Sequence, residues 1–141
     1  MKELTVPATL EELSTVQTFV EGELEAHACA MKTIMQISIA VEEIYVNIAH
    51  YAYHPEVGEA AVRCEIGGEP LQITIQFLDR GKPFNPLAKT DADITLSAEE
   101  RNIGGLGILM VKKSMDRVDY SYEDGKNILT IKKTLTDALK G

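Results

Sequence analysis

The sequence is poor in basic residues and has no long apolar segment, and each absence excludes a class of protein. Lysine and arginine together number 14 against 22 acidic residues, which gives a net charge of -8 at pH 7. Because non-specific nucleic-acid binding needs a basic surface, we expect no direct contact with nucleic acid. A membrane-spanning helix needs about 20 consecutive apolar residues, and no run in this chain approaches that length. We therefore expect no membrane segment.

Cysteine and histidine are also scarce. The two cysteines, Cys29 and Cys64, and the three histidines have no metal-ligand spacing, so the sequence predicts no zinc site. Two buried free thiols are typical of a protein in the reducing cytoplasm, which is the location we expect. The serines have no recognisable histidine and aspartate partners, so we do not expect a hydrolase triad.

What the sequence does contain is the pattern of one domain over residues 1–141. Leu4 and Val6 alternate with polar residues and predict a first strand. Thr9 and Glu12 have the spacing of a capping box, which predicts that a helix begins there and runs to about His27.

The rest of the chain predicts a second helix and two hairpins. Residues 33–53 show helical spacing up to a proline, after a break at about 29–32. Residues 60–66 and 71–77 then alternate between apolar and polar, which predicts a hairpin. A short helix and a second hairpin follow, in which residues 118–122 are predicted as a core strand and Asp124-Gly125 as the turn.

Between the hairpins, residues 87–102 are polar and show no periodicity, which is typical of a functional lid. We expect two layers from these elements, which are one strand, two helices, a hairpin, this lid, a short helix and a second hairpin. The predicted fold class is therefore α+β, a two-layer sandwich with a mixed, mostly antiparallel sheet and helices on one face.

Three motifs could carry chemistry. Glu43 and Asn47 are four residues apart on the second predicted helix, so carboxylate and amide share one face beside the apolar stripe. They could activate a hydroxyl and hold a metal ion, or could be an ordinary solvated edge. Asp79 follows a buried strand, with Gly81 two residues later, and could accept a hydrogen bond from an exocyclic amine or simply cap a turn.

The third motif is Gly104-Gly105-Leu106-Gly107, at the start of the short helix. Glycines there would let backbone N–H groups approach a phosphate, and a helix N-terminus favours an anion. Taken alone, the same glycines are also compatible with a simple turn.

In this order, the three motifs resemble the nucleotide-binding fold shared by gyrase-type ATPases and sensor histidine kinases, the GHKL family. The resemblance is closest to the stand-alone anti-sigma-factor serine/threonine kinases and extends over nearly the whole chain. Residues 41–53 (VEEIYVNIAHYAY) resemble their first box, residues 79–86 (DRGKPFNP) the second and residues 104–108 (GGLGI) the third.

The resemblance implies ATP and Mg²⁺ as cofactors and a role for each motif residue. Asn47 would be a ligand of the Mg²⁺ that bridges the phosphates, and Glu43 would be the general base that deprotonates a substrate hydroxyl. Asp79 would bind the adenine amine, and Gly81 would allow the base to approach closely. Many relatives have a histidine four residues after the asparagine, but this chain has Tyr51 there.

The resemblance also assigns phosphate and base contacts to later residues. Gly104, Gly105 and Gly107 would present backbone amides to the phosphates, and the 87–102 loop would be the ATP lid. By the same resemblance, Arg101 would reach the terminal phosphate and Thr130 would contact adenine.

The choice among relatives rests on what the chain has room for. Only about 40 residues precede Glu43, so we do not expect the sensor and dimerisation helices of a histidine kinase. The best fit is a kinase that phosphorylates a serine or threonine of a STAS-type antagonist and sequesters a sigma factor, and the family also allows a homodimer. Two alternatives stay open: an ATP-gated protein-binding module without kinase activity, and a structural domain that binds no nucleotide.

Overall fold

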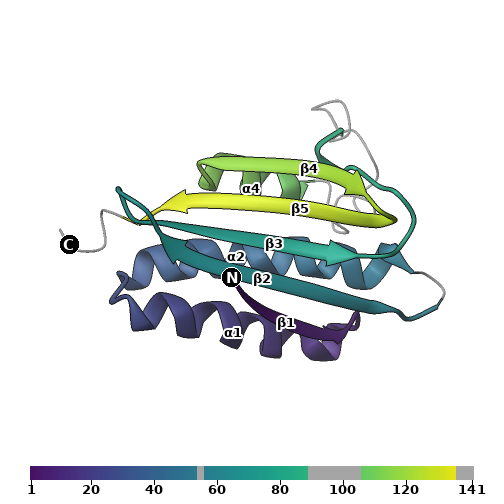
Figure 1. Ribbon diagram of the computed structural model, residues 1–141, viewed down its shortest axis with the longest axis horizontal. Helices are drawn as coiled ribbons and strands as arrows, with labels where there is room; N and C mark the ends of the chain where they lie inside the picture. The colour runs from purple at the N-terminus through teal and green to yellow at the C-terminus, as the bar shows by residue number, and fades with distance from the viewer. Residues whose placement is uncertain (54–55, 89–105, 136–141) are drawn as a thin grey trace.

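The computed structural model describes residues 1–53, 56–88 and 106–135, and within these ranges the chain forms a five-stranded sheet covered by helices (Figure 1). The strands are β1 (Lys2–Pro7), β2 (Glu59–Gly67), β3 (Gln72–Asp79), β4 (Arg117–Glu123) and β5 (Lys126–Thr134). The helices are α1 (Leu13–Ala26), α2 (Met31–Asn47) and α4 (Leu106–Ser114), with short helical turns η1 (Leu10–Glu12), η2 (Ile48–Ala52) and η3 (Pro86–Ala88).

The sheet has the order β1-β2-β3-β5-β4, and every neighbouring pair is antiparallel. The α+β class and the helices on one face are confirmed, whereas the expected mixed sheet is in fact wholly antiparallel over the described strands. Both hairpins form as predicted. In the second, Asp124 and Gly125 have φ angles of 53° and 76°, which fits the tight turn that an Asp-Gly pair favours.

Strand β4 lies at the edge of the sheet, which corrects its prediction as a core strand. Val118 and Tyr120 are half-buried and Tyr122 is exposed. The predicted alternation is present, but an edge strand has a neighbour on one side only and so buries less of its apolar face.

The first helix begins later than the sequence predicts. Thr9 has extended backbone angles, and its side chain makes no capping hydrogen bond. Its carbonyl oxygen instead accepts a hydrogen bond from the Glu12 N–H at 3.1 Å and one from the Tyr45 hydroxyl at 2.7 Å. No capping box forms: the short turn η1 follows Thr9 directly, and the α-helix α1 starts at Leu13.

The second helix begins at Met31, two residues before the predicted start, and continues beyond Asn47 as the π-helical turn η2. Ala28, with φ of 55°, adopts a left-handed conformation that ends the first helix. Ile34, Ile37, Val41 and Ile44 of the predicted apolar stripe are buried, and Ile48 is partly buried against them. Helix α2 therefore presents the predicted face to the sheet.

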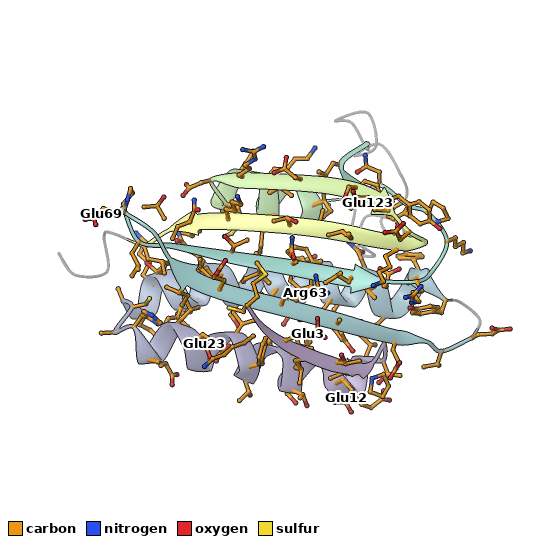
Figure 2. The ribbon with its side chains drawn as sticks, viewed as in Figure 1. Glu3, Glu12, Glu23, Arg63, Glu69 and Glu123 are labelled. Atoms are coloured by element: carbon orange, nitrogen blue, oxygen red, sulfur yellow. The ribbon has the colours of Figure 1, made fainter. Side chains whose placement is uncertain are left out.

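The described helices all lie on one face of the sheet, and no described helix covers the other, which is called the uncovered face below. Helices α1 and α2 lie behind the sheet in Figure 1, with α4 behind β4. Along β2, β3 and β5 most buried residues alternate with partly exposed ones on the uncovered face, where Arg63 donates a hydrogen bond to Glu3 at 2.6 Å (Figure 2). Among the described helices, none has both the length and the apolar character that a membrane span requires.

Candidate functional site

Glu43 and Asn47 lie in the last two turns of α2, half-buried at the edge of the core. The helix is held in place by Ile37 and Ile44, which are almost fully buried, and by the hydroxyl of Tyr45, which contacts the end of β1. Within the described residues, neither Glu43 nor Asn47 has a hydrogen bond or ion pair to another side chain. As far as these residues are concerned, both polar groups are available to a ligand.

The carboxyl group of Glu43 is in an environment that disfavours its charge. Burial raises its pKa above the usual glutamate value, and the neighbouring carboxylate of Glu42 raises it further. A carboxylate with a raised pKa is a stronger proton acceptor once it is ionised, which suits a general base.

Asp79 ends β3 on the helix-covered face and is 7% exposed. Its Oδ1 accepts hydrogen bonds from the Gly81 N–H and from Nδ2 of Asn127, both at 2.9 Å. Burial raises its pKa, while these two hydrogen bonds act in the opposite direction. Its Oδ2 accepts no hydrogen bond from the part of the chain that the structure describes. A buried carboxylate oxygen without a donor is suited to an N–H group of a ligand.

Gly81 brings the Asp79 turn against the end of the helix that carries Glu43 and Asn47. The Lys82 N–H donates a hydrogen bond to the Ala52 carbonyl oxygen at 3.2 Å. A Cβ atom on Gly81 would lie 2.1 Å from the same oxygen, so only glycine permits this contact. The first two motifs are thus adjacent, and the role of Gly81 toward a base stays a prediction.

Tyr53 is a second link at this junction, and sequence reasoning missed it. Its hydroxyl accepts a hydrogen bond from the Arg80 N–H at 2.7 Å and donates one to the Glu59 carbonyl oxygen at 2.6 Å. Its ring occupies the space above Gly58, where a Cβ would lie 2.4 Å from the ring. One side chain therefore connects the helix end to the start of β2 and the residue after Asp79.

The prediction for Thr130 is corrected by the sheet. Thr130 accepts a hydrogen bond from Gln76 at 3.4 Å on the uncovered face, whereas Asp79 is on the helix-covered face. Because side chains alternate along β5, it is Asn127 that reaches Asp79. A signal was present in the sequence, since Asn127 is a polar residue in phase with Leu129 and Ile131, which are buried.

The glycine motif is only partly described. Gly107 lies in the first turn of α4, which packs against α2. Arg101, Gly104, Gly105 and residues 89–102 of the predicted lid lie outside the described residues. Their predicted contacts with phosphates stay predictions.

The described residues are compatible with a metal ion that is coordinated mainly by phosphates and water and only in small part by the protein. They contain no group of three or more histidine, cysteine, aspartate or glutamate side chains that could hold a metal alone. Mg²⁺ commonly takes one or two protein oxygens and completes its shell with phosphates and water. The amide of Asn47, which no described side chain occupies, is suited to be one such ligand.

Comparison with known proteins finds a family match over most of the chain. The profile of the family described as "Histidine kinase-like ATPase domain" matches residues 6–133. A "Serine-protein kinase RsbW" of Bacillus cereus is 26% identical over 132 residues, which cover 92% of this chain and 82% of the relative. The protein of the same name in Bacillus thuringiensis (strain Al Hakam) matches with the same identity and coverage.

Among solved structures, a chain of the SiaB-SiaC complex from Pseudomonas aeruginosa is similar with a TM-score of 0.57. The match covers 94% of this chain and 89% of that one at 14% sequence identity. At this identity the likeness shows a shared fold.

Proposed function

The chain belongs to the histidine kinase-like ATPase domain family, and we propose that it is an ATP-dependent protein serine/threonine kinase. The observation that carries this proposal concerns Oδ2 of the buried Asp79, to which no described residue donates a hydrogen bond. Asp79 lies where the turn after β3 meets the end of the helix that carries Glu43 and Asn47. The similarity to proteins named serine-protein kinase supports the choice of reaction.

In this proposal, ATP lies between the Asp79 turn and the start of α4. Asp79 accepts a hydrogen bond from the adenine amine through Oδ2. Gly107, with Gly104 and Gly105 before it, presents backbone amides to the phosphates, and Arg101 reaches the terminal phosphate. Asn47 contributes one ligand to Mg²⁺, which would neutralise charge on the phosphates.

Glu43 is the general base in the proposed reaction. The hydroxyl oxygen of a serine or threonine forms a bond to the γ-phosphorus, and the bond from that phosphorus to the β,γ-bridging oxygen breaks. ADP leaves, and the carboxylate of Glu43 accepts the hydroxyl proton. Because the pKa of Glu43 is raised, the acid limb of the rate profile should lie above the pH at which an ordinary glutamate ionises.

The proposed substrate is a STAS-type antagonist, and the proposed captive is a sigma factor that the antagonist releases. This assignment rests on the resemblance of the three motifs to anti-sigma-factor kinases and on the named relatives. The same resemblance suggests a homodimer, which light scattering of the purified protein tests directly.

Phosphate transfer to purified STAS-domain proteins of the source genome, followed with γ-labelled ATP, tests the proposal. Glu43→Gln keeps the shape of the side chain but cannot accept the proton, so we expect the transfer rate to fall about 100-fold or more. Its neighbour Glu42 is exposed and provides the matched control, Glu42→Gln. At pH 8 that variant should retain the wild-type rate.

Two results would decide against the kinase. If the wild type binds ATP but labels none of the antagonists, the chain is an ATP-gated binding module. If Glu43→Gln transfers phosphate as fast as Glu42→Gln, Glu43 is not the base. Calorimetry with Mg-ATP for each variant separates a loss of chemistry from a loss of binding.

A further inference from the structure

Asn127 is the most highly connected polar side chain near Asp79 among the described residues, and it is 7% exposed. Its Nδ2 donates hydrogen bonds to Asp79 Oδ1 at 2.9 Å and to the Lys82 carbonyl oxygen at 3.0 Å, and lies 3.4 Å from the Gly81 carbonyl oxygen. Its Oδ1 accepts hydrogen bonds from the Phe84 N–H at 3.1 Å and from the Tyr120 hydroxyl. One amide thus organises the whole turn after β3.

These partners leave the amide only one orientation. Phe84 N–H is an obligatory donor and must face Oδ1, while the carbonyl oxygen of Lys82 is an obligatory acceptor and must face Nδ2. A rotation by 180° would set acceptor against acceptor and donor against donor at these two contacts. Asn127 therefore always presents an N–H group to Asp79.

A fixed N–H donor determines which oxygen of Asp79 is left for a ligand. Oδ1 already receives Asn127 and the Gly81 N–H, so a nucleotide base can meet only Oδ2. Both bonds favour the ionised carboxylate against the effect of burial. An ionised Oδ2 is purely an acceptor, whereas a protonated carboxyl group would also be a donor.

We propose that Asn127, oriented by the Phe84 N–H and the Lys82 carbonyl and further constrained by the Tyr120 hydroxyl, is the positioning residue that makes this site select adenine over guanine. The proposal rests on the nucleotide site proposed above. At the position that faces Oδ2, adenine has an exocyclic amine, a donor, and guanine has a carbonyl oxygen, an acceptor. The carboxylate attracts the first and repels the second, provided that Asn127 keeps it ionised and fixed.

Removing the N–H donor of Asn127 should therefore reduce the preference for adenine over guanine more than it reduces the affinity for nucleotides in general. In Asn127→Ala, the carboxyl group can rotate and is more easily protonated, so it can donate to the guanine carbonyl. In Tyr120→Phe, Oδ1 of Asn127 keeps only the Phe84 N–H, and the amide becomes less constrained. Tyr120→Phe changes one oxygen atom on an edge strand, so it should fold even if Asn127→Ala does not.

Calorimetry with Mg-ATP and, separately, Mg-GTP measures the ratio of affinities. We expect Asn127→Ala to bind ATP about tenfold or more weakly, the size of a lost hydrogen bond to a charged group, with GTP affinity unchanged or higher. We expect Tyr120→Phe to lower the ATP-to-GTP ratio in the same direction by a smaller factor. Tyr122→Phe is the matched control, because Tyr122 is on the same strand and is exposed.

Each outcome decides between the proposals. A lower ATP-to-GTP ratio in Tyr120→Phe, but not in Tyr122→Phe, supports the role of the pair. If ATP binds to the wild type and both Tyr120→Phe and any folded Asn127→Ala keep the wild-type ratio, the inference is overturned and the nucleotide site stands. If the wild type binds neither nucleotide, the proposed function itself fails, and the inference fails with it.

Discussion

At the scale of single residues, the site keeps a carboxylate where its charge is unfavourable. Asp79 is buried, and burial raises its pKa despite two hydrogen bonds. The folded chain thus holds the Asp79 proton more tightly than the unfolded chain does. As pH rises through the raised pKa, ionisation costs the folded state free energy, and this cost is absent below the usual aspartate pKa. In the proposed function, the contact of Asp79 with adenine is the reason to retain such a group.

Asp79→Asn should separate stability from binding. The amide can keep Oδ1 as the acceptor for Gly81 and Asn127, so we expect the variant to be more stable than the wild type at pH 8. The advantage should fade toward pH 4, where wild-type Asp79 is increasingly protonated. Urea unfolding at both pH values measures this, and calorimetry should show that Mg-ATP binding is lost. Equal stability of the two proteins at pH 8 would mean that the hydrogen bonds fully offset the burial of the charge.

At the scale of elements, the site depends on how closely a turn approaches a helix end. The Asp79 turn meets η2 at Gly81 and Ala52, where there is no space for a Cβ atom. The hydroxyl of Tyr53 bridges the same junction to β2. Movement of this junction would shift Asp79 relative to Glu43 and Asn47, because it joins the Asp79 turn to the end of the helix that carries them.

Two glycine variants test that dependence, and we expect them to change the free energy of unfolding in opposite directions. Gly81→Ala must displace the turn from the Ala52 carbonyl, which should cost ~1–3 kcal/mol of unfolding free energy and weaken ATP binding. Gly22 lies in α1, and a Cβ atom added there would have no described atom within 4 Å. Gly22→Ala should therefore stabilise the protein by ~0.5–1 kcal/mol and leave ATP binding unchanged. Thermal unfolding and calorimetry of both variants measure this, and a Gly81→Ala protein with wild-type stability would contradict the packing argument.

At the scale of the whole molecule, nucleotide binding should be visible as a gain in stability. A ligand at 100 times its dissociation constant adds about 2.7 kcal/mol to the unfolding free energy. We expect Mg-ATP to raise the melting temperature and EDTA to remove much of that gain. In Asn47→Ala the difference between ATP with and without Mg²⁺ should disappear. A Mg²⁺-dependent shift that persists in Asn47→Ala would show that the metal is held by other groups.

The order of the elements could be predicted from the sequence because each element has a local signal. The helical spacing of Val16, Val20 and Leu24 and the alternation of Ile73, Ile75 and Phe77 both match residues that are buried. The errors concern signals that tertiary contacts override. The side chain of Thr9 makes no capping hydrogen bond, while its carbonyl oxygen accepts one from the distant Tyr45 hydroxyl.

The motif residues proposed for the site were proposed from the sequence alone, whereas the contacts that support them could not be predicted from it. Asn127 is 48 residues from Asp79, and Tyr53 is 27 residues from Arg80. Whether such residues meet depends on the order of the strands and on their register, which local patterns do not specify. Thr130, predicted to contact adenine, lies on the uncovered face and away from Asp79, because it is out of phase with the buried residues of β5.

The uncovered face of the sheet has a practical consequence for optical assays. Its side chains point away from the helices and from Asp79, so a dye attached there would report on the protein without occupying the proposed nucleotide site. The native thiols would compete poorly for the dye, because burial raises the pKa of the Cys64 thiol to about 12 and also raises that of Cys29. An added cysteine at exposed Glu65 of β2 would therefore be the preferred point of attachment for fluorescence measurements or for immobilisation on a sensor chip.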